Sequence, residues 1–433
     1  MIRILSYNEM NRADIFQRST VPTGVEDTVS RIIQQVKEQK DSALLDYCTQ
    51  FDGGAPERLE VSEEEIRQAF ESTDPQFIKV LKKASDNITS FHSCQIRNSF
   101  IQNKSSGIVV GQKIVPLDRV GLYVPGGTAA YPSSVLMNCI PAKIAGVKEI
   151  IMVTPGKNGT VPPAILSAAK IAGVHRIFKV GGAQAVAALA YGTETIPKVD
   201  KIVGPGNAFV AEAKKQVFGS VDIDMIAGPS EILIIADQSC QAGQVAADML
   251  SQAEHDKMAS AVLVTDSPRL AESVRSELER QLSVLPREEI ARSSIENNGK
   301  IIVAPNLETA IDIANEIAPE HLELCVDNPF DYLDRIRHAG SVFLGKNCPE
   351  ALGDYMAGPN HTLPTSGTAR FSSPLSVDDF VKKYQYTYYT KAALSAAADD
   401  IIYFAEQEGL SAHARSVSVR LAEDLEDGKD GMG

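Results

Sequence analysis

Short β-branched runs alternate with longer helical patterns from Gly107 onward, and this alternation restricts the fold more than any other feature of the chain. The runs are KEIIMVT, RIFKVG, DKIVG, DIDMIAG, EILIIAD, ASAVLVTD and KIIVAPN. Most of the intervening helical patterns end at a glycine: Gly146, Gly173, Gly192 and Gly219. Strands and helices in this order, with apolar strands, predict an α/β fold whose parallel sheets are covered on both faces.

A short internal repeat supports this interpretation. Lys143–Ile150 reads KIAGVKEI, and Lys170–Ile177 reads KIAGVHRI. The offset equals about one βα unit, in which a glycine closes the helix and the next strand follows at once. We therefore expect each copy to lie at a helix-to-strand junction.

The two ends of the chain are expected to be mainly helical. Val25–Asp52 has apolar residues at helical spacing, and SEEEIRQAFEST has the pattern of a capped helix. Ser376–Gly433 returns to a helical pattern. Two clusters of α/β units predict two sheet domains, the second one discontinuous. The expected divisions are an N-terminal segment (1–24), a helical part with the first portion of the discontinuous domain (25–127), the other sheet domain (128–237), the remainder of the discontinuous domain (238–375) and a C-terminal helical domain (376–433).

Composition excludes several classes of protein. The chain of 433 residues has a formal net charge of −14, so it lacks the surplus of cations that nucleic-acid binding requires. No apolar run approaches the ~20 residues of a membrane span, and no secretory signal pattern is visible at the start. Six cysteines without CxxC spacing favour reduced thiols. A cytoplasmic location is expected.

The stretch LSQAEHDKMASAVLVT raises the question of what its polar side chains hold. Gln252 and His255 are three residues apart and would share one face of a helix that leads into a strand. A buried, hydrogen-bonded histidine beside a surface glutamine explains this pair as well as a ligand site does.

Three further pairs of polar residues stand near predicted element ends. Glu320 and His321 are adjacent in IAPEHLEL, a combination suited to proton transfer near neutral pH, although a histidine at a helix C-terminus is also favourable. The Gly/Pro-rich stretch ALGDYMAGPNHTLPTSG and the helix start GLSAHARSV supply the others, namely Asp354 with His361 and Glu408 with His413.

Two imidazoles and a carboxylate are common zinc ligands, but an amide oxygen is unusual and no HExxH or Cys/His finger is present.

Three glycine-rich turns, in VPGGTAAYP, KVGGAQ and KIVGPGN, follow strands and precede helices. Backbone N–H groups at such helix starts bind phosphate well, although tight βα turns need glycine in any case. None of the three is GxGxxG, so the dinucleotide fingerprint is absent.

The motifs taken together are more specific than any one of them. The chain resembles the histidinol dehydrogenase family over nearly its whole length, in the segments GLYVPGG, VGGAQAVAALAYGT, KIVGPGNAFV, AGPSEILIIAD, MLSQAEH, APEHLEL, GDYMAGPNHTLPT and LSAHARSV. The resemblance implies oxidation of L-histidinol to L-histidine through the aldehyde, with two hydride transfers to NAD⁺. It also implies an intertwined homodimer, with two incomplete Rossmann-like domains and small helical N- and C-terminal parts.

The resemblance also implies roles for particular residues. Glu320 and His321 would form the acid/base pair. The partner subunit would supply Glu408 and His413 to each site. One Zn²⁺ per subunit would be held by Gln252, His255, Asp354 and His413. The substrate would contact these four residues and also Ser230, His321, His361 and Glu408. NAD would contact Tyr123, Gln184 and Asn207.

Two hypotheses about the chemistry follow. Zinc would mainly orient the substrate, while His321 takes the hydroxyl proton and Glu320 activates water to hydrate the aldehyde. Cys139 and Cys325 lie in apolar patterns and are expected to be core residues rather than thiol nucleophiles. The alternatives are a zinc-dependent hydrolase that uses the same side chains and a non-catalytic solute-binding module with two lobes.

Overall fold

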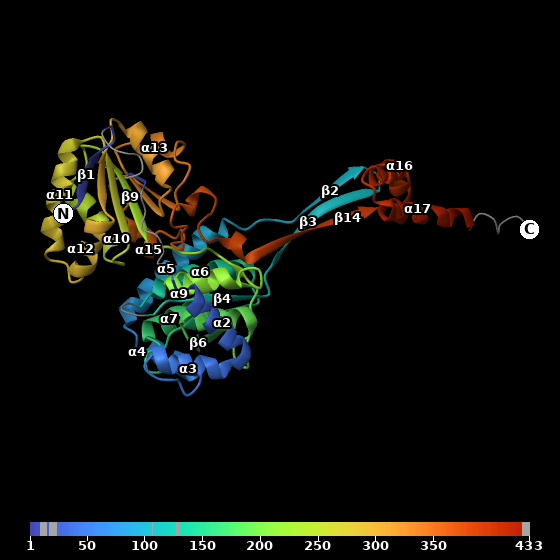
Figure 1. Cartoon of the computed structure of the whole chain (residues 1–433), viewed down its shortest axis with the longest axis horizontal. Helices are drawn as coiled ribbons and strands as arrows, with labels where there is room; N and C mark the ends of the chain where they lie inside the picture. Colours follow the sequence, from blue (N-terminus) through green and yellow to red (C-terminus); the bar gives the residue numbers. More distant parts are fainter. Residues whose placement is uncertain (9–14, 17–23, 106, 127–129, 427–433) are drawn as a thin grey trace, which may run out of the picture. The chain divides into compact units, whose positions relative to one another are not determined.

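The computed structural model describes residues 1–8, 15–16, 24–105, 107–126 and 130–426, with side chains described to residue 421. The chain forms two compact units (Figure 1). The first unit comprises Met1–Ile96 and Pro116–Phe380, and the second comprises Arg97–Val115 and Val381–Gly433. Among the described residues, no helix has both the length and the apolar character to cross a membrane.

The first unit contains a six-stranded parallel sheet whose order is β1-β11-β10-β9-β12-β13. Side chains of its central strands alternate between the two faces: Ile232 and Ile234 join one apolar cluster, while Leu233 and Ile235 join the other. Helices α10, α11 and α12 cover the first face and α13 covers the second (Figure 1). The elements are β1 (Arg3–Ser6), β9 (Glu231–Ala236), α10 (Ala242–Ala253), β10 (Ser260–Thr265), α11 (Pro268–Leu282), α12 (Glu288–Asn297), β11 (Lys300–Val303), α13 (Leu307–Ile317), β12 (His321–Cys325), α14 (Phe330–Leu333), β13 (Ser341–Leu344) and α15 (Glu350–Tyr355).

A five-stranded parallel sheet of order β6-β5-β4-β7-β8 is also part of the first unit. Helices α2, α3, α8 and α9 bury apolar residues on one face, and α4, α5, α6 and α7 bury theirs on the other. The elements are α2 (Glu26–Gln39), α3 (Asp41–Phe51), α4 (Glu63–Ser72), α5 (Pro75–Ser93), β4 (Arg119–Tyr123), α6 (Pro132–Ala145), β5 (Glu149–Thr154), α7 (Pro163–Ala172), β6 (Arg176–Lys179), α8 (Gly182–Tyr191), β7 (Lys201–Val203), α9 (Ala208–Val217) and β8 (Asp222–Ile223).

Local signals in the sequence explain where several of these helices begin and end. Ser62 and Glu65 form the capping box that starts α4, as the pattern predicts. Both copies of the repeat lie at helix ends, where Gly146 and Gly173 adopt left-handed conformations before β5 and β6. The parallel, doubly covered sheets and the repeat are therefore confirmed.

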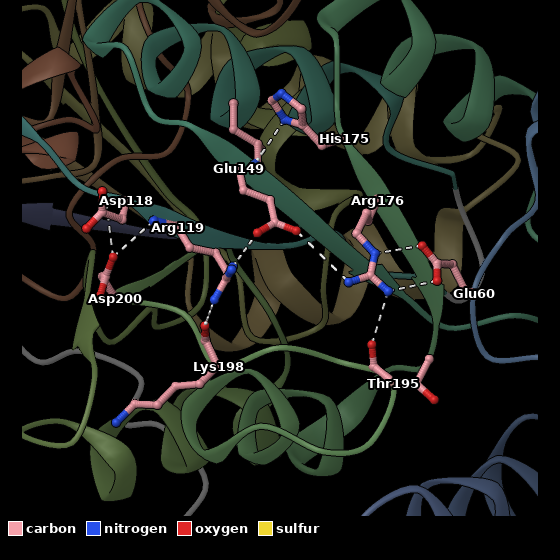
Figure 2. Close-up of polar contacts among 10 residues, drawn as sticks. Glu60, Asp118, Arg119, Glu149, His175, Arg176, Thr195, Lys198 and Asp200 are labelled. Carbon is pink, nitrogen blue, oxygen red and sulfur yellow. Dashed lines mark hydrogen bonds and ion pairs between the residues drawn. The ribbon is translucent and has the colours of Figure 1, made fainter.

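Charged side chains join the amino ends of β4, β5 and β6 (Figure 2). Glu149 Oε2 accepts a 2.5 Å hydrogen bond from Arg119 Nε, and Arg176 donates to both carboxylate oxygens of Glu60 at 2.7 and 2.8 Å. Asp200 Oδ2 accepts from the backbone N–H groups of Asp118 and Arg119. This network ties neighbouring strands together at one edge and leaves the opposite, carboxyl edge to the glycine-rich turns.

The second unit holds a three-stranded sheet of order β14-β3-β2 and two helices. Strands β2 and β3 are antiparallel. The helical expectation for 376–433 was wrong for one stretch, VKKYQYTYY, whose tyrosines and threonine suit a strand better than a helix. The elements are β2 (Phe100–Ser105), β3 (Ile108–Pro116), β14 (Val381–Tyr389), α16 (Lys391–Gln407) and α17 (Ser411–Glu426).

The sheets divide the chain differently from the expected borders at 127 and 237. Strand β4 precedes residue 128 but lies at the centre of the five-stranded sheet, while β9 ends before 237 and pairs with β10 and β12. The expected N-terminal segment, residues 1–24, contributes β1 to the edge of the six-stranded sheet. Residues 9–14 and 17–23 of that segment lie outside the described residues.

Candidate active site

Most of the predicted polar residues gather at the amino edge of the six-stranded sheet. His321 is the first residue of β12, Glu320 precedes it, and Ser230 precedes β9. Helix α10 ends at Ala253, so Gln252 lies in its last turn and His255 lies in the turn that follows, not on the helix as expected. Ligands of open α/β sheets usually bind at the carboxyl edge, which makes this location uncommon.

Backbone atoms of Glu231 fix the Glu320–His321 pair. Glu320 Oε2 accepts a 2.8 Å hydrogen bond from the N–H of Glu231, and His321 Nδ1 lies 3.0 Å from the carbonyl oxygen of the same residue. Both side chains are buried. Pairing of β9 with β12 therefore places the acid and the imidazole side by side, as the sequence predicted.

Burial sets the protonation of this pair. Loss of solvent lowers the pKa of His321 to about 4, so the imidazole is neutral at pH 7. Loss of solvent also raises the pKa of Glu320 well above its ordinary value, against the Glu231 N–H bond that lowers it. Three oxygen atoms that can accept a proton lie near His321 Nδ1: the carbonyl of Glu231 at 3.0 Å, Glu320 Oε2 at 3.6 Å and Glu350 Oε1 at 3.8 Å. The proton therefore belongs on Nδ1, and Nε2 keeps its lone pair.

Three side chains beside this pair have the geometry of a cation site. One potential ligand atom from each of His255, Glu350 and Asp354 lies within 4.8 Å of the others. Glu350 was missed by the sequence analysis, although Glu350 and Asp354 are four residues apart and share one face of α15. Imidazole nitrogen and carboxylate oxygen are ordinary zinc donors, so this set fits a divalent ion.

Gln252 and His361 complete the surroundings of that cluster. One heteroatom of the buried Gln252 amide faces two acceptors, Glu350 Oε1 at 3.0 Å and the Glu231 carbonyl at 3.2 Å, so it is the amide nitrogen. His361 Nδ1 lies 3.6 Å from Asp354 Oδ1. Burial opposes ionisation of Asp354, but its bond with His361 and the nearby imidazoles lower its pKa below the ordinary value.

A cavity of about 520 Å³ opens beside these residues. His255 and Asp354 line its polar end together with Glu254, and side chains of α5 and α6 form its apolar wall. The cavity leaves one side of the cluster open to a small ligand or to another segment of protein.

Glu408 and His413 do not belong to this group within the first unit. Glu408 caps the end of α16 and His413 lies in the first turn of α17, so both are in the second unit. Both side chains are exposed.

The predicted cofactor residues lie at the carboxyl edge of the five-stranded sheet. The buried hydroxyl of Tyr123 accepts a 3.0 Å hydrogen bond from the N–H of Gly182 at the start of α8, and burial raises the pKa of Tyr123 to about 12. Gln184 is buried in the first turn of α8. Asn207 Oδ1 caps α9 by accepting from two backbone N–H groups, which leaves the amide nitrogen available. In the remaining glycine-rich turn, VPGGTAAYP, residues 127–129 lie outside the described residues.

A buried ion pair fixes the turn that carries Asn207. Lys214 Nζ donates to the carbonyl of Gly204 at 3.0 Å and forms an ion pair with Asp224. Asp224 Oδ2 accepts from the N–H of Gly204 at 2.7 Å. Gly204 has a φ of +115°, and a Cβ there would lie 2.1 Å from the carbonyl oxygen of Tyr123. The turn is therefore held from both sides in a conformation that requires glycine.

The family model described as histidinol dehydrogenase matches residues 17–421. The chain belongs to the histidinol dehydrogenase family. Relatives named histidinol dehydrogenase include one from Bacillus cereus, 56% identical over 92% of this chain and 94% of the relative. Another, from Clostridium acetobutylicum, is 55% identical over 97% of this chain and 99% of the relative. The crystal structure of histidinol dehydrogenase from Elizabethkingia anophelis matches with a TM-score of 0.93 and 39% identity, covering 98% of each chain. Membership of the family and the α/β fold are thus confirmed.

Proposed function

We propose that this protein oxidises L-histidinol to L-histidine through L-histidinaldehyde, with two hydride transfers to NAD⁺, in the last steps of histidine biosynthesis. The observation that carries the proposal is the convergence of Glu320 and His321 on the His255–Asp354 cluster. The names of the relatives supply the substrate. These names favour a dehydrogenase over the two alternatives, a zinc hydrolase and a solute-binding module. No observation on the described residues specifically supports either alternative.

Zinc is the metal that we propose for the cluster, with Gln252, His255 and Asp354 as ligands and the partner subunit's His413 as the fourth. Bound zinc would orient the amine and imidazole nitrogens of histidinol. The donor set has one carboxylate and neutral nitrogen or oxygen atoms, which suits a divalent ion. Ser230, His361 and the partner subunit's Glu408 are proposed to contact substrate, and the 3.6 Å separation of His361 Nδ1 from Asp354 Oδ1 supports this for His361.

His321 is the proposed base for alcohol oxidation. Its Nδ1–H is fixed on the Glu231 carbonyl, so the free Nε2 can take the hydroxyl proton while hydride leaves the carbinol carbon for the nicotinamide. Glu320 is the proposed base for the second half-reaction. It would take a proton from the water that adds to the aldehyde, and its raised pKa makes it a stronger base than an exposed carboxylate. Return of that proton to the former aldehyde oxygen would give the gem-diol, which would transfer the second hydride to a second NAD⁺ and release a hydroxyl proton to leave the carboxyl group of histidine.

NAD⁺ is proposed to bind at the carboxyl edge of the five-stranded sheet, in contact with Tyr123, Gln184 and Asn207. The N-termini of α8 and α9 lie there, and the positive end of each helix dipole would favour the negatively charged pyrophosphate. The exposure of Glu408 and His413 in the second unit supports a homodimer in which each subunit completes the site of the other. A cytoplasmic location is part of the same proposal.

Product stoichiometry tests the proposed function. Two NADH should form for each histidinol consumed, and a chelator should abolish the reaction. Glu320→Gln should slow histidinaldehyde oxidation more than histidinol oxidation, because only the aldehyde needs an activated water. Equal slowing of both half-reactions would refute the division of labour, and histidinol consumption without NADH would refute the dehydrogenase.

A further inference from the structure

Glu350 is a buried carboxyl group that none of the proposed steps uses. It is 2% exposed and begins α15, one turn before Asp354. Its backbone N–H donates to Glu323 Oε1 at 2.8 Å, which ties the start of the helix to β12. Burying a carboxyl group is costly unless its oxygens find partners, so the contacts of those oxygens indicate what the residue does.

Both oxygens of Glu350 contact the last turn of α10. Oε1 lies 3.0 Å from the amide nitrogen of Gln252, and Oε2 accepts from Ser251 Oγ at 3.3 Å. Glu350 is therefore hydrogen-bonded to two consecutive residues, Ser251 and Gln252, in the segment that carries the proposed ligands Gln252 and His255. To bind a metal itself, Glu350 would have to give up at least one of these bonds.

An amide is an ambiguous ligand, because only its oxygen coordinates a cation. Rotation of the Gln252 side chain by half a turn would replace that oxygen with an NH₂ group, which has no lone pair to offer. At Gln252 the NH₂ side is fixed by two acceptors, one for each N–H: Glu350 Oε1 at 3.0 Å and the Glu231 carbonyl at 3.2 Å. Of these two, Glu350 Oε1 is the nearer and the only one that belongs to a side chain.

We propose that Glu350 is a positioning residue that orients the Gln252 amide so that its oxygen, and not its nitrogen, is presented to the divalent ion. This inference rests on the proposed function, in which Gln252 is a metal ligand. Partners that fix the orientation of a metal ligand contribute about 10–100-fold to metal affinity. Glu350 would act through Gln252 alone.

Zinc affinity of the full-length protein tests the inference, measured with Zn²⁺ in competition against a chromogenic chelator. Glu350→Met removes both acceptors at similar length and should weaken zinc binding by about 10–100-fold. Glu350→Gln removes the charge but keeps an acceptor for Gln252, so it should stay near wild type. Thermal melting of the metal-free variants shows whether each one folds. If Glu350→Met does not fold, the isosteric Glu350→Gln still tests the inference, because a loss of zinc affinity in that variant would contradict it.

The double variant separates positioning from direct ligation. In a Gln252→Ala background, Glu350→Met should cause no further loss of zinc affinity, because the amide through which it acts is gone. Equal losses in Glu350→Gln and Glu350→Met, or a loss that persists without Gln252, would show that Glu350 binds the metal itself and would overturn the inference. Unchanged affinity in Glu350→Met would also overturn it. A wild-type protein that binds no zinc would refute the proposed zinc site itself.

Discussion

The buried pair of Lys214 and Asp224 provides a quantitative prediction about the turn at Gly204. Their side chains are 2% and 1% exposed, and both bind the backbone of Gly204. Lys214→Met would leave the Asp224 carboxylate buried without its counter-charge and the Gly204 carbonyl without its donor. Breaking a buried pair in this way costs about 3–5 kcal/mol. We expect that loss in the free energy of unfolding.

An exposed pair on the same sheet is the matched control. Lys148 and Asp118 lie 2.8 Å apart at the amino edge, with side chains 76% and 77% exposed. Lys148→Met should leave the free energy of unfolding almost unchanged, because solvent screens such a pair. Urea unfolding measures both variants, and calorimetric titration with NAD⁺ should show weaker binding for Lys214→Met alone. Similar losses of stability in the two variants, or unaltered NAD⁺ affinity in Lys214→Met, would refute the reasoning.

Four other outcomes are expected. Burial and the neighbouring Asp248 raise the pKa of Glu323 from 4.5 to about 8. The folded state therefore holds a proton on Glu323 that the unfolded state releases, so the stability of the wild type should fall as pH rises from 5 to 8. Glu323→Gln cannot release this proton, so its melting temperature should fall less over the same range. Parallel melting-temperature profiles of the wild type and the variant would contradict this. Ser62→Ala should lower the unfolding free energy by about 1 kcal/mol in urea, through loss of the capping box. Gly204→Ala should abolish NAD⁺ binding in titration, whereas Gly219→Ala, where a Cβ meets nothing within 4 Å, should preserve it. A chelator that removes the proposed zinc should lower the melting temperature by mass action, and an unaffected melting curve would argue against a tightly held ion.

Local patterns in the sequence identified most elements of the two parallel sheets, but they missed strand β14. The glycines at 146 and 173 end helices because their backbones adopt left-handed conformations, and a glycine at such a position can be recognised without knowledge of the fold. The assignment of strands to sheets was less accessible. Strands β4 and β9 have the same apolar character, and the partner of a buried parallel strand depends on packing across the whole unit.

In the candidate site, too, residues with a local sequence signal were recognised and residues that depend on the fold were not. Glu320 and His321 were recognised because adjacent residues remain adjacent in the fold. Glu350 was overlooked because its importance comes from Gln252, nearly a hundred positions earlier in the chain, and no local pattern links the two. The roles of Glu408 and His413 came from the family resemblance alone, since exposed residues on α16 and α17 carry no signal of their own.

The pairing of β1 with β11 has a consequence for the order in which the protein forms. Residues 3–6 leave the ribosome long before their partner strand at 300–303 is made. By then every strand of the five-stranded sheet, from Arg119 to Ile223, has been synthesised and can assemble. Strand β1 can therefore be incorporated only after β11 has been made, and until it pairs, the edge of β11 is open to pairing with a neighbouring polypeptide.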